Sequence, residues 1–525
     1  MLSEKRNPAC GATPEARLEA LLQSVAVRAS VIERVLSSAG QQSLLEYLTS
    51  ICCISPVSFQ SRDDLAGVVE QYLMPLLGDS LAKQAALDLL QHPVALTANH
   101  HGVDFFAQSV QGSFLFGIAK QQVPGICTIP VFSCANIPLD NLTYPRGALL
   151  YASDPQQNWP QRIPFFSNKL RRQPVARVKG LDRPMLQQAA KQVRRLIEIG
   201  QNTASLECLL DVLETEYMAE DVLSKPGYSA QSVILNQRIW SRLFCPSAMM
   251  PELITIELET LAEGLFLKDL SNSESLVSVL FAMPMISELY RQLDGVGGCW
   301  NDQQLQQRWA DRRGAEPLKT SGCGTFFFWG VDQRQRRIPL MLASVAGVLM
   351  LQGCDDNGNE SQFHINSKAL IQAIEEGRLL PSVFGCFLVI ALARGVTCLG
   401  GYYQAEYLPQ MQAGVIAVLR QYDRLDIAAI LAECCTDGYL SGMQAVMVEQ
   451  AGALLPAGVL EILASGAITA TEVAFIRTIS LRDAHYASLA ETTADLMPQK
   501  MDSQSRVSLM IDQHKYLLDK VILRQ

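Results

Sequence analysis

The sequence predicts an α/β protein with a Rossmann-like parallel sheet, a helical insertion and a helical C-terminal region. Two short, continuously apolar runs, residues 94–98 and 126–132, suit strands that are buried on both faces of a parallel sheet. A stretch with helical spacing of apolar residues, 107–121, separates them, so strand, loop, helix and strand form a right-handed βαβ unit. Long stretches on both sides repeat apolar residues every three or four positions, which is typical of helices.

The length of the chain predicts several structural units. At 525 residues it is too long for one core of ordinary size. We expect N-terminal helices over residues 1–90, a first part of the core over 91–182, a helical insertion over 183–320, a second part of the core over 321–408 and a helical C-terminal region over 409–525.

Individual elements follow from periodicity and from glycine and proline positions. Residues 81–90 form a helix that stops before Pro93. A hairpin is expected from residues 324–329 and 337–342, and a short helix with a serine N-cap over 367–377. The tail after residue 409 is expected to be nearly all helix. Further helices are expected in the insertion at 185–198, 204–223, 234–244, 252–267 and 275–293.

Charge and composition exclude several classes of protein. The net charge of -9 argues against a nucleic-acid or anionic-membrane partner, because either needs a basic face. No apolar run approaches the ~20 residues that span a bilayer. The charged N-terminal residues are not followed by the apolar run of a signal peptide, so we expect a cytoplasmic protein. The 14 cysteines include no Cys-x-x-Cys motif, and no metal site is visible. Because no signal peptide is apparent, we expect these thiols to be reduced. Two pairs are adjacent in sequence, Cys52-Cys53 and Cys434-Cys435, and such neighbours rarely bridge each other.

The strongest candidate for a site is the loop between the first strand and its helix. His100 and His101 lie beside Asp104, and three of the six histidines fall between residues 92 and 101. The loop leaves the carboxyl end of a strand and enters a helix N-terminus, where ligands bind in open parallel sheets. Imidazoles next to a carboxylate suit proton transfer near neutral pH. The alternative is that one histidine caps the helix while the other packs on the sheet.

Two further loops complete the expected site. After the second strand, Asn136, Asp140 and Asn141 could bind hydroxyl or amino groups, or could simply form a turn. Cys134 could be a nucleophile, but the sequence supplies no base for it. Gly400 and Gly401 allow a ligand to approach the backbone closely, although a turn uses such glycines equally well. The remaining residues that we assign to substrate binding are Asn99, Gln108, Gln404 and Tyr407.

The order of these segments resembles that of bacillithiol cysteine-adding enzymes, a family of cysteine ligases, over roughly residues 90–410. The similar segments are the strand and glycine-bearing loop at 97–102, the strand at 129–133, the hairpin at 326–340 and the Gly-Gly segment at 400–407. The resemblance implies a Rossmann core with a helical insertion and a reaction that joins cysteine to an amino-sugar conjugate. This chain departs from the family where it has Asn99-His100-His101 in place of a Gly-Gln-Gln-type loop, so the resemblance extends to the scaffold more than to the substrates.

We therefore expect a biosynthetic enzyme, of the ligase or transferase type, that condenses an amino acid or similar amine with a small acceptor. Cysteine is one candidate amine, and ATP is a candidate cofactor. One imidazole would take the proton of the amine and Asp104 would orient that imidazole. The alternatives are a nucleotide- or ligand-binding protein with little catalysis, and a helical interaction module with a vestigial pocket. A homodimer through the C-terminal helices is also expected.

Overall fold

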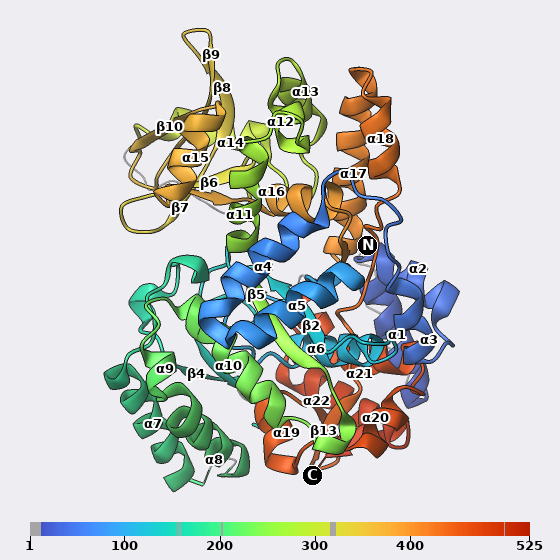
Figure 1. Cartoon of the computed structure of the whole chain (residues 1–525). Coiled ribbons are helices and arrows are strands. Elements are labelled where there is room, and N and C mark those ends of the chain that lie inside the picture. The colour runs from blue at the N-terminus through green and yellow to red at the C-terminus, as the bar shows by residue number, and fades with distance from the viewer. Residues whose placement is uncertain are drawn as a thin grey trace, which may run out of the picture.

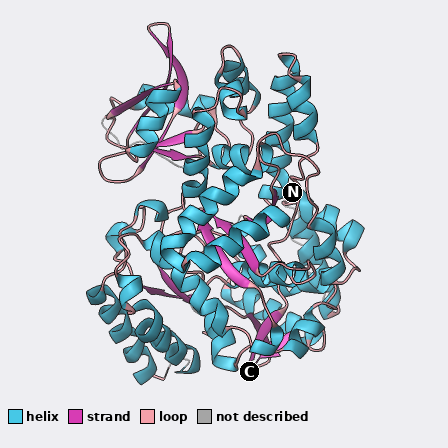
Figure 2. Cartoon of the chain, in the orientation of Figure 1, coloured by secondary structure: helices cyan, strands magenta, loops and turns pink. Residues whose placement is uncertain are grey.

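A four-stranded parallel sheet lies at the centre of the computed structural model, which describes residues 12–154, 156, 159–200, 203–314, 322–497 and 499–524. The strand order is β12-β1-β2-β5, and all three pairings are parallel. Figure 2 shows these strands in the middle of the molecule with helices around them. The predicted α/β class with a parallel sheet is confirmed. The strands are β1 (Val94–Leu96), β2 (Thr128–Ser133), β5 (Glu252–Glu257) and β12 (Thr397–Leu399).

The sheet separates two hydrophobic cores. Successive side chains of a strand point to opposite faces, and here Leu96 and Val131 enter one core while Ala95, Phe132 and Ile254 enter the other. Because both faces are covered, the strands read as continuous apolar runs, and this is why two of them could be predicted.

Helix α6 (Ala107–Lys120) follows β1, as predicted, and every one of its residues is buried. Gln111, in the middle of this helix, binds the C-terminal region through both ends of its amide. Its Nε2 donates to the carbonyls of Val446 (2.8 Å) and Ala457 (3.0 Å), and its Oε1 accepts from the backbone N–H of Ala445 (2.7 Å). The βαβ unit is therefore enclosed by later parts of the chain.

The N-terminal region is helical, as predicted, and within the described residues five helices precede the sheet. Figure 1 shows α4 and α5 in front of β2 and β5. They are α1 (Pro14–Ala26), α2 (Ser30–Ala39), α3 (Leu44–Ile51), α4 (Arg62–Leu77) and α5 (Asp79–Gln91).

One predicted helix is wrong at its start. Residues 252–257 form β5, the strand that completes one edge of the parallel sheet, and a helix begins only at Leu258. The segment Ile254-Thr255-Ile256 is β-branched and buried, which favours a strand. The glutamates and leucines around it also fit a helical period, and for so short a run tertiary pairing decides.

Helices dominate the segment between β2 and residue 314. Two antiparallel strands, β3 (Gly147–Leu150) and β4 (Gln161–Pro164), and the 3-10 turns η1 (Asn168–Leu170) and η2 (Val175–Arg177) come first. There follow α7 (Arg183–Glu198), α8 (Thr203–Val212), the π-helical turn η3 (Leu213–Tyr217), α9 (Glu220–Leu223), α10 (Tyr228–Arg242), the 3-10 turn η4 (Pro246–Ala248), α11 (Leu258–Leu270), α12 (Leu276–Phe281), α13 (Met285–Gln292) and α14 (Asp302–Asp311).

Two three-stranded antiparallel sheets form the next part of the chain, at the upper left of Figure 1. The predicted hairpin is present as β6 and β7. The second sheet, β10-β9-β8, was not predicted. The helix predicted at 367–377 is α15, and its N-cap is Asn366 rather than Ser367. The elements are β6 (Phe328–Val331), β7 (Arg337–Pro339), β8 (Met341–Val345), β9 (Val348–Cys354), β10 (Glu360–His364), α15 (Ser367–Glu375) and β11 (Leu379–Pro381).

The C-terminal region is helical but also contains a small sheet, so the prediction of a nearly all-helical tail is wrong in part. The sheet order is β14-β13-β15. β14 and the first three residues of β13 are buried, and all three strands are too short to show a period. The elements from residue 383 onward are α16 (Val383–Phe387), the π-helical turn η5 (Leu388–Leu392), β12, α17 (Gln404–Gln421), α18 (Leu425–Ala432), β13 (Val446–Gln450), β14 (Ala453–Pro456), α19 (Val459–Ser465), α20 (Ala470–Ile476), α21 (Leu481–Leu496), α22 (Ser503–Leu517) and β15 (Ile522–Arg524).

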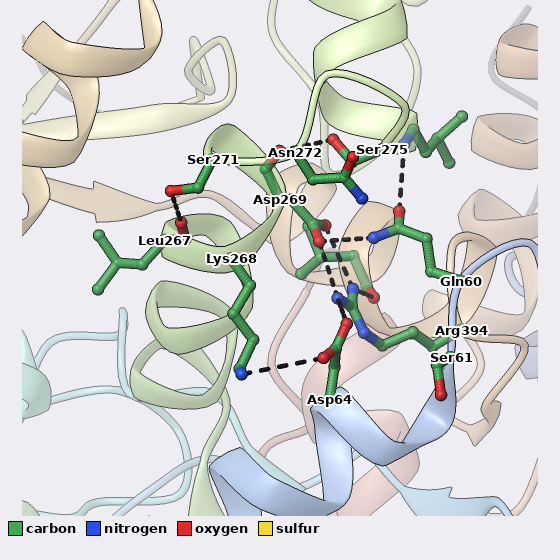
Figure 3. A network of polar contacts seen from close by, with 12 residues as sticks. Gln60, Ser61, Asp64, Leu267, Lys268, Asp269, Ser271, Asn272, Ser275 and Arg394 are labelled. Carbon is green, nitrogen blue, oxygen red and sulfur yellow. Dashed lines mark hydrogen bonds and ion pairs between the residues drawn. The ribbon is translucent and has the colours of Figure 1, made fainter.

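A buried ion pair ties together three distant parts of the chain (Figure 3). The Arg394 guanidinium, which is fully buried just before β12, donates to both oxygens of Asp269 at 2.8 and 3.2 Å. Asp269 lies near the end of α11, and it also accepts from the amide of Gln60 (2.6 Å). Asp64, in the first turn of α4, lies 3.3 Å from the same guanidinium and 3.8 Å from the half-exposed Lys268.

Removal of one member of this pair should be costly. We expect Asp269→Ala to lower the free energy of unfolding by about 3–5 kcal/mol, because it leaves a buried guanidinium without its main partner. Lys268→Ala removes a surface ion pair next to the network and should cost about 0–1 kcal/mol. Urea unfolding of the two variants measures the difference, and equal losses would contradict a structural role for the buried pair.

Candidate functional site

The loops that follow β1 and β2 lie side by side at the carboxyl edge of the sheet, as expected. The backbone N–H of His101 donates to the carbonyl of Cys134 (2.8 Å), and the N–H of Cys134 donates to the carbonyl of Asn99 (3.0 Å). His100 and Cys134 thus continue the parallel pairing of the two strands. The edge brings together side chains from the two loops that the sequence singled out.

His100 is oriented by the second loop. The backbone N–H of Thr143 donates to Asn141 Oδ1 (2.9 Å), which turns the Asn141 amide nitrogen toward His100 Nδ1 (2.8 Å). An amide nitrogen can only donate, so Nδ1 is unprotonated and the proton of the neutral ring is on Nε2. Burial lowers the pKa of His100 to about 4, which keeps this imidazole neutral at physiological pH.

In His101, the nitrogen without a hydrogen-bond partner is Nδ1, whereas in His100 Nδ1 is the nitrogen that accepts a hydrogen bond. Its Nε2 lies 3.3 Å from the carbonyl oxygen of Ser229 and 2.9 Å from the Ser229 hydroxyl. A carbonyl oxygen can only accept, so Nε2 carries the proton and Nδ1 bears a lone pair. The Ser229 hydroxyl in turn donates to the carboxylate of Glu257. Burial lowers the pKa of His101 to about 4, so His101 is a neutral imidazole at neutral pH.

Glu257 lies at the end of β5 and is 5% exposed. Burial, and then the neighbouring Glu259, raise the pKa of Glu257 to about 7. Glu257, Ser229 and His101 therefore form a chain of carboxylate, hydroxyl and imidazole, and the lone pair of His101 Nδ1 has no partner among the described residues.

Asp104 has a different role from the one expected for it. Its carboxylate accepts from Asn99 Nδ2 (3.2 Å) and from the backbone N–H of Phe106 (3.1 Å), so it lies at the N-terminus of α6. Its own backbone N–H donates to Asn236 Oδ1 (3.0 Å). Burial raises the pKa of Asp104 to about 7. The orientation of an imidazole, which the sequence assigned to Asp104, is provided by Ser229 and Glu257.

Glu259, in the first turn of α11, holds the second loop in place. Its carboxylate accepts from the backbone N–H groups of Ala135 (2.7 Å) and Asn136 (2.9 Å) and from the thiol of Cys134 (3.2 Å). Burial and this carboxylate raise the pKa of Cys134 well above its usual range. Cys134 is therefore a protonated thiol and is unsuited to be a nucleophile.

Two arginines lie close to these carboxylates. Arg337 Nη1 donates to the side-chain oxygen of Asn136 (3.1 Å), and its guanidinium lies over the ring of Trp329. Arg177 pairs with Glu263 at 3.5 Å, one turn after Glu259 on α11. Burial raises the pKa of Glu263 to about 8. This end of the sheet can therefore offer both donors and acceptors to a polar ligand.

The third expected loop, residues 400–407, mainly makes contacts that support the fold. The side chain of Gln404 fills the space beside Gly400, where an added Cβ would lie 2.4 Å from Gln404 Cδ. Gln404 Nε2 donates to Thr97 Oγ1 (2.7 Å) and to the carbonyl of Cys398 (3.1 Å). At Gly401, by contrast, an added Cβ would lie 3.8 Å from the nearest atom, which is an ordinary contact distance. Tyr407 packs against Gly297 and Gly298, and burial raises its pKa above the usual range.

A large cavity lies beside the second loop. Its volume is about 1670 Å³, and Leu142, which follows Asn141 in sequence, belongs to its wall. Asp140 makes long ion pairs with Arg146 (3.8 Å) and with Arg162 (3.9 Å), a cavity residue. Glu491 also lines the cavity, and burial raises the pKa of this carboxyl to about 8. Other lining residues are Phe106, Trp159, Glu449, Glu461, Lys500 and Arg506.

Several of the predicted residues have a buried polar atom that no other described residue satisfies. These atoms are Asn99 Oδ1, His101 Nδ1, Asn136 Nδ2 and Gln108 Nε2. Buried polar atoms of this kind are rare in native proteins and usually meet water or a ligand. A small cavity of about 30 Å³, which Asn99 and Asp104 help to line, has room for about two waters. It has no room for a substrate.

No family model matches the sequence, and comparisons with curated proteins and with solved structures found no match either. Within the described ranges, His, Cys, Asp and Glu side chains form no group of three or more that could hold a metal ion. No helix in the same part of the chain combines the length and apolarity that a membrane span requires.

Four residues of this site were not predicted from the sequence: Ser229, Glu257, Glu259 and Arg337. The two glutamates were missed because residues 252–257 also fit a helical period, although their β-branched run was a signal for a strand. A strand ending at Glu257 would have placed both carboxylates at the carboxyl edge. Ser229, 128 positions from His101, gave no local signal.

Asp104 should make stability depend on pH. Its pKa is about 7 in the folded chain and 3.8 ordinarily, so the unfolded chain ionises first and stability falls as pH rises from about 4 through 7. Asp104→Asn cannot ionise, so its free energy of unfolding should fall less over this range. The difference should be about 1.4 kcal/mol for each pH unit that separates the folded and unfolded pKa values. Urea unfolding at a series of pH values measures it.

Asp79→Asn, which alters an exposed carboxylate at the start of α5, is the matched control. It should leave the pH dependence as in wild type. If Asp104→Asn also leaves the pH dependence of stability unchanged, the pKa of Asp104 is not raised as its burial indicates.

Proposed function

We propose that this protein is an enzyme that joins an amine, such as an amino acid, to a small acceptor at the carboxyl edge of its parallel sheet. One observation carries the proposal. The Glu257–Ser229–His101 chain leaves His101 Nδ1 as a buried lone pair without a partner among the described residues. Such a nitrogen is suited to accept a proton from an attacking amine.

The neighbouring groups have complementary roles in this proposal. When His101 becomes an imidazolium, Ser229 and the Glu257 carboxylate stabilise its charge. His100, which is neutral with its proton on Nε2, donates a hydrogen bond to the oxygen of the acceptor, where negative charge develops. Arg337 and Asn136 hold a carboxylate or phosphate of the acceptor. If the acceptor is a free carboxylic acid, its activation requires energy, so ATP belongs to the proposal.

A second candidate is a ligand-binding protein with little catalysis. The cavity of about 1670 Å³ supports it, because this volume exceeds that of typical small-molecule pockets. Its wall carries both cations and carboxylates. A homodimer through the C-terminal helices and a cytoplasmic location remain predictions.

The proposal predicts which ligands stabilise the protein and which variant loses the reaction. In a thermal-shift screen, an amino acid (cysteine first) or an amino sugar at a hundred times its dissociation constant should add about 2.7 kcal/mol of stability. Mass spectrometry of mixtures of amine, acceptor and ATP should detect a condensed product. His101→Gln should lower its rate of formation by about 10²–10⁴-fold, since a general base contributes that much.

His364→Gln, on an exposed residue of β10, is the control and should retain the full rate. Stabilisation by a ligand without any product, in wild type and variants alike, would favour the ligand-binding candidate. If no ligand stabilised the protein and no product formed, the result would contradict a site at the carboxyl edge of the sheet.

The activity should also depend on pH through Glu257. The imidazolium is stabilised only when Glu257 is a carboxylate. The pKa of Glu257 is about 7, which lies within the pH range of an assay. The rate should therefore rise as pH increases through about 7. Glu257→Gln should lower the rate and remove this rise, whereas a profile unchanged by the substitution would exclude Glu257 from the reaction.

A further inference from the structure

The two pairs of adjacent cysteines in the sequence meet in the folded chain. Cys53 follows α3 and Cys435 follows α18, yet the two thiols lie close enough in the folded chain for Cys435 to raise the pKa of Cys53. The backbone around them is fixed as well. The N–H of Cys435 donates to the hydroxyl of the buried Ser55 (3.1 Å), and Thr397 Oγ1 donates to the carbonyl of Cys53 (2.6 Å).

Only one thiol of each pair takes part in this contact. Cys434 is buried, and its thiol points to the carbonyl of Leu392 (3.6 Å). Cys52 lies close enough to the buried Lys120 to interact with its charge. Cys53 is exposed and Cys435 is half-buried, so reagents in solution can reach this pair of thiols.

We propose that Cys53 and Cys435 are an oxidisable dithiol that closes into a reversible disulfide. The two thiols lose two protons and two electrons as the S–S bond forms. An oxidant of the disulfide or azo class takes them up and becomes two thiols or a hydrazine. The bond would join the segment after α3 to the segment after α18. The hydrogen bond from Cys435 to Ser55 already holds these segments together, so little backbone movement is needed.

The surroundings of the pair set the speed of this reaction. Partial desolvation of the Cys53 thiol, and then its proximity to Cys435, raise the pKa of Cys53 to about 12. The thiolate is the species that attacks a disulfide. Attack by Cys53 on the oxidant should therefore be slow at neutral pH and faster at alkaline pH.

The location of the disulfide gives it a structural consequence. Cys435 lies three residues before Gly438, whose carbonyl accepts from the N–H of Gly400. Tyr47 of α3 donates to the carbonyl of Tyr439 (2.6 Å). The disulfide would therefore fasten α3 to the segment that lines the end of β12, and the oxidised chain should unfold at a higher temperature than the reduced one.

Peptide mapping of the full chain tests the proposal. Reduced protein is treated with diamide, its remaining thiols are alkylated, and it is digested with trypsin without reduction. Residues 35–62 and 425–477 contain no internal cleavage site, so each pair of cysteines stays in one peptide. We expect these peptides to be linked, with a mass lower than their sum by two hydrogen atoms, and to separate on treatment with dithiothreitol.

Four variants assign the bond. Cys53→Ser and Cys435→Ser should each abolish the linked peptide, while Cys52→Ser and Cys434→Ser should retain it, with melting temperatures confirming that all four fold. A linked peptide that persists in Cys53→Ser or Cys435→Ser would overturn the assignment. So would two peptides that are always recovered separately from oxidised wild type.

Discussion

The ion pair between Arg394 and Asp269 is the contact on which the arrangement of the sheet most depends. Asp269 lies on the helix that follows β5, and Arg394 precedes β12, so the pair joins the connections of the two edge strands. Gln60 and Asp64 add the N-terminal helices to the same network. Buried charges are expensive to desolvate, and a pair of this kind favours one arrangement because any other leaves a charge unpaired.

The arrangement of the edge strands in turn determines the chemistry at the carboxyl edge. Because β5 lies beside β2, Glu257 and Glu259 reach the loops that carry the histidines and the asparagines. Most polar groups there bind one another: Glu259 holds the second loop, Asp104 holds the start of α6 and Asn141 holds His100. His101 Nδ1 remains outside these contacts, and the proposed reaction rests on that atom.

The sequence alone predicts the parts of this structure that are local. The strand at 94–98, the helix at 107–121 and the strand at 126–132 were visible because their patterns are complete within a few residues. The strand at 252–257 was not, because its pattern also fits a helix and only its pairing with β2 distinguishes the two.

The same distinction applies to the site. His100, His101 and Asn141 could be found because loops after parallel strands meet at one edge. Their partners could not be assigned, because Asp104 is next to the histidines in sequence while Ser229 and Glu257 are next to His101 only in the folded chain. Proximity in sequence suggested the wrong orienting group.

The most direct test of the central claim is nitrogen-15 NMR of the six histidines. We expect His101, assigned by its loss in His101→Gln, to have a protonated Nε2 and an unprotonated Nδ1. It should stay neutral down to about pH 5, because its pKa is about 4. Substitution of Ser229 by Ala should disturb this tautomer. A proton on Nδ1, or an imidazolium at neutral pH, would contradict the claim that His101 Nδ1 is the proton acceptor of the site.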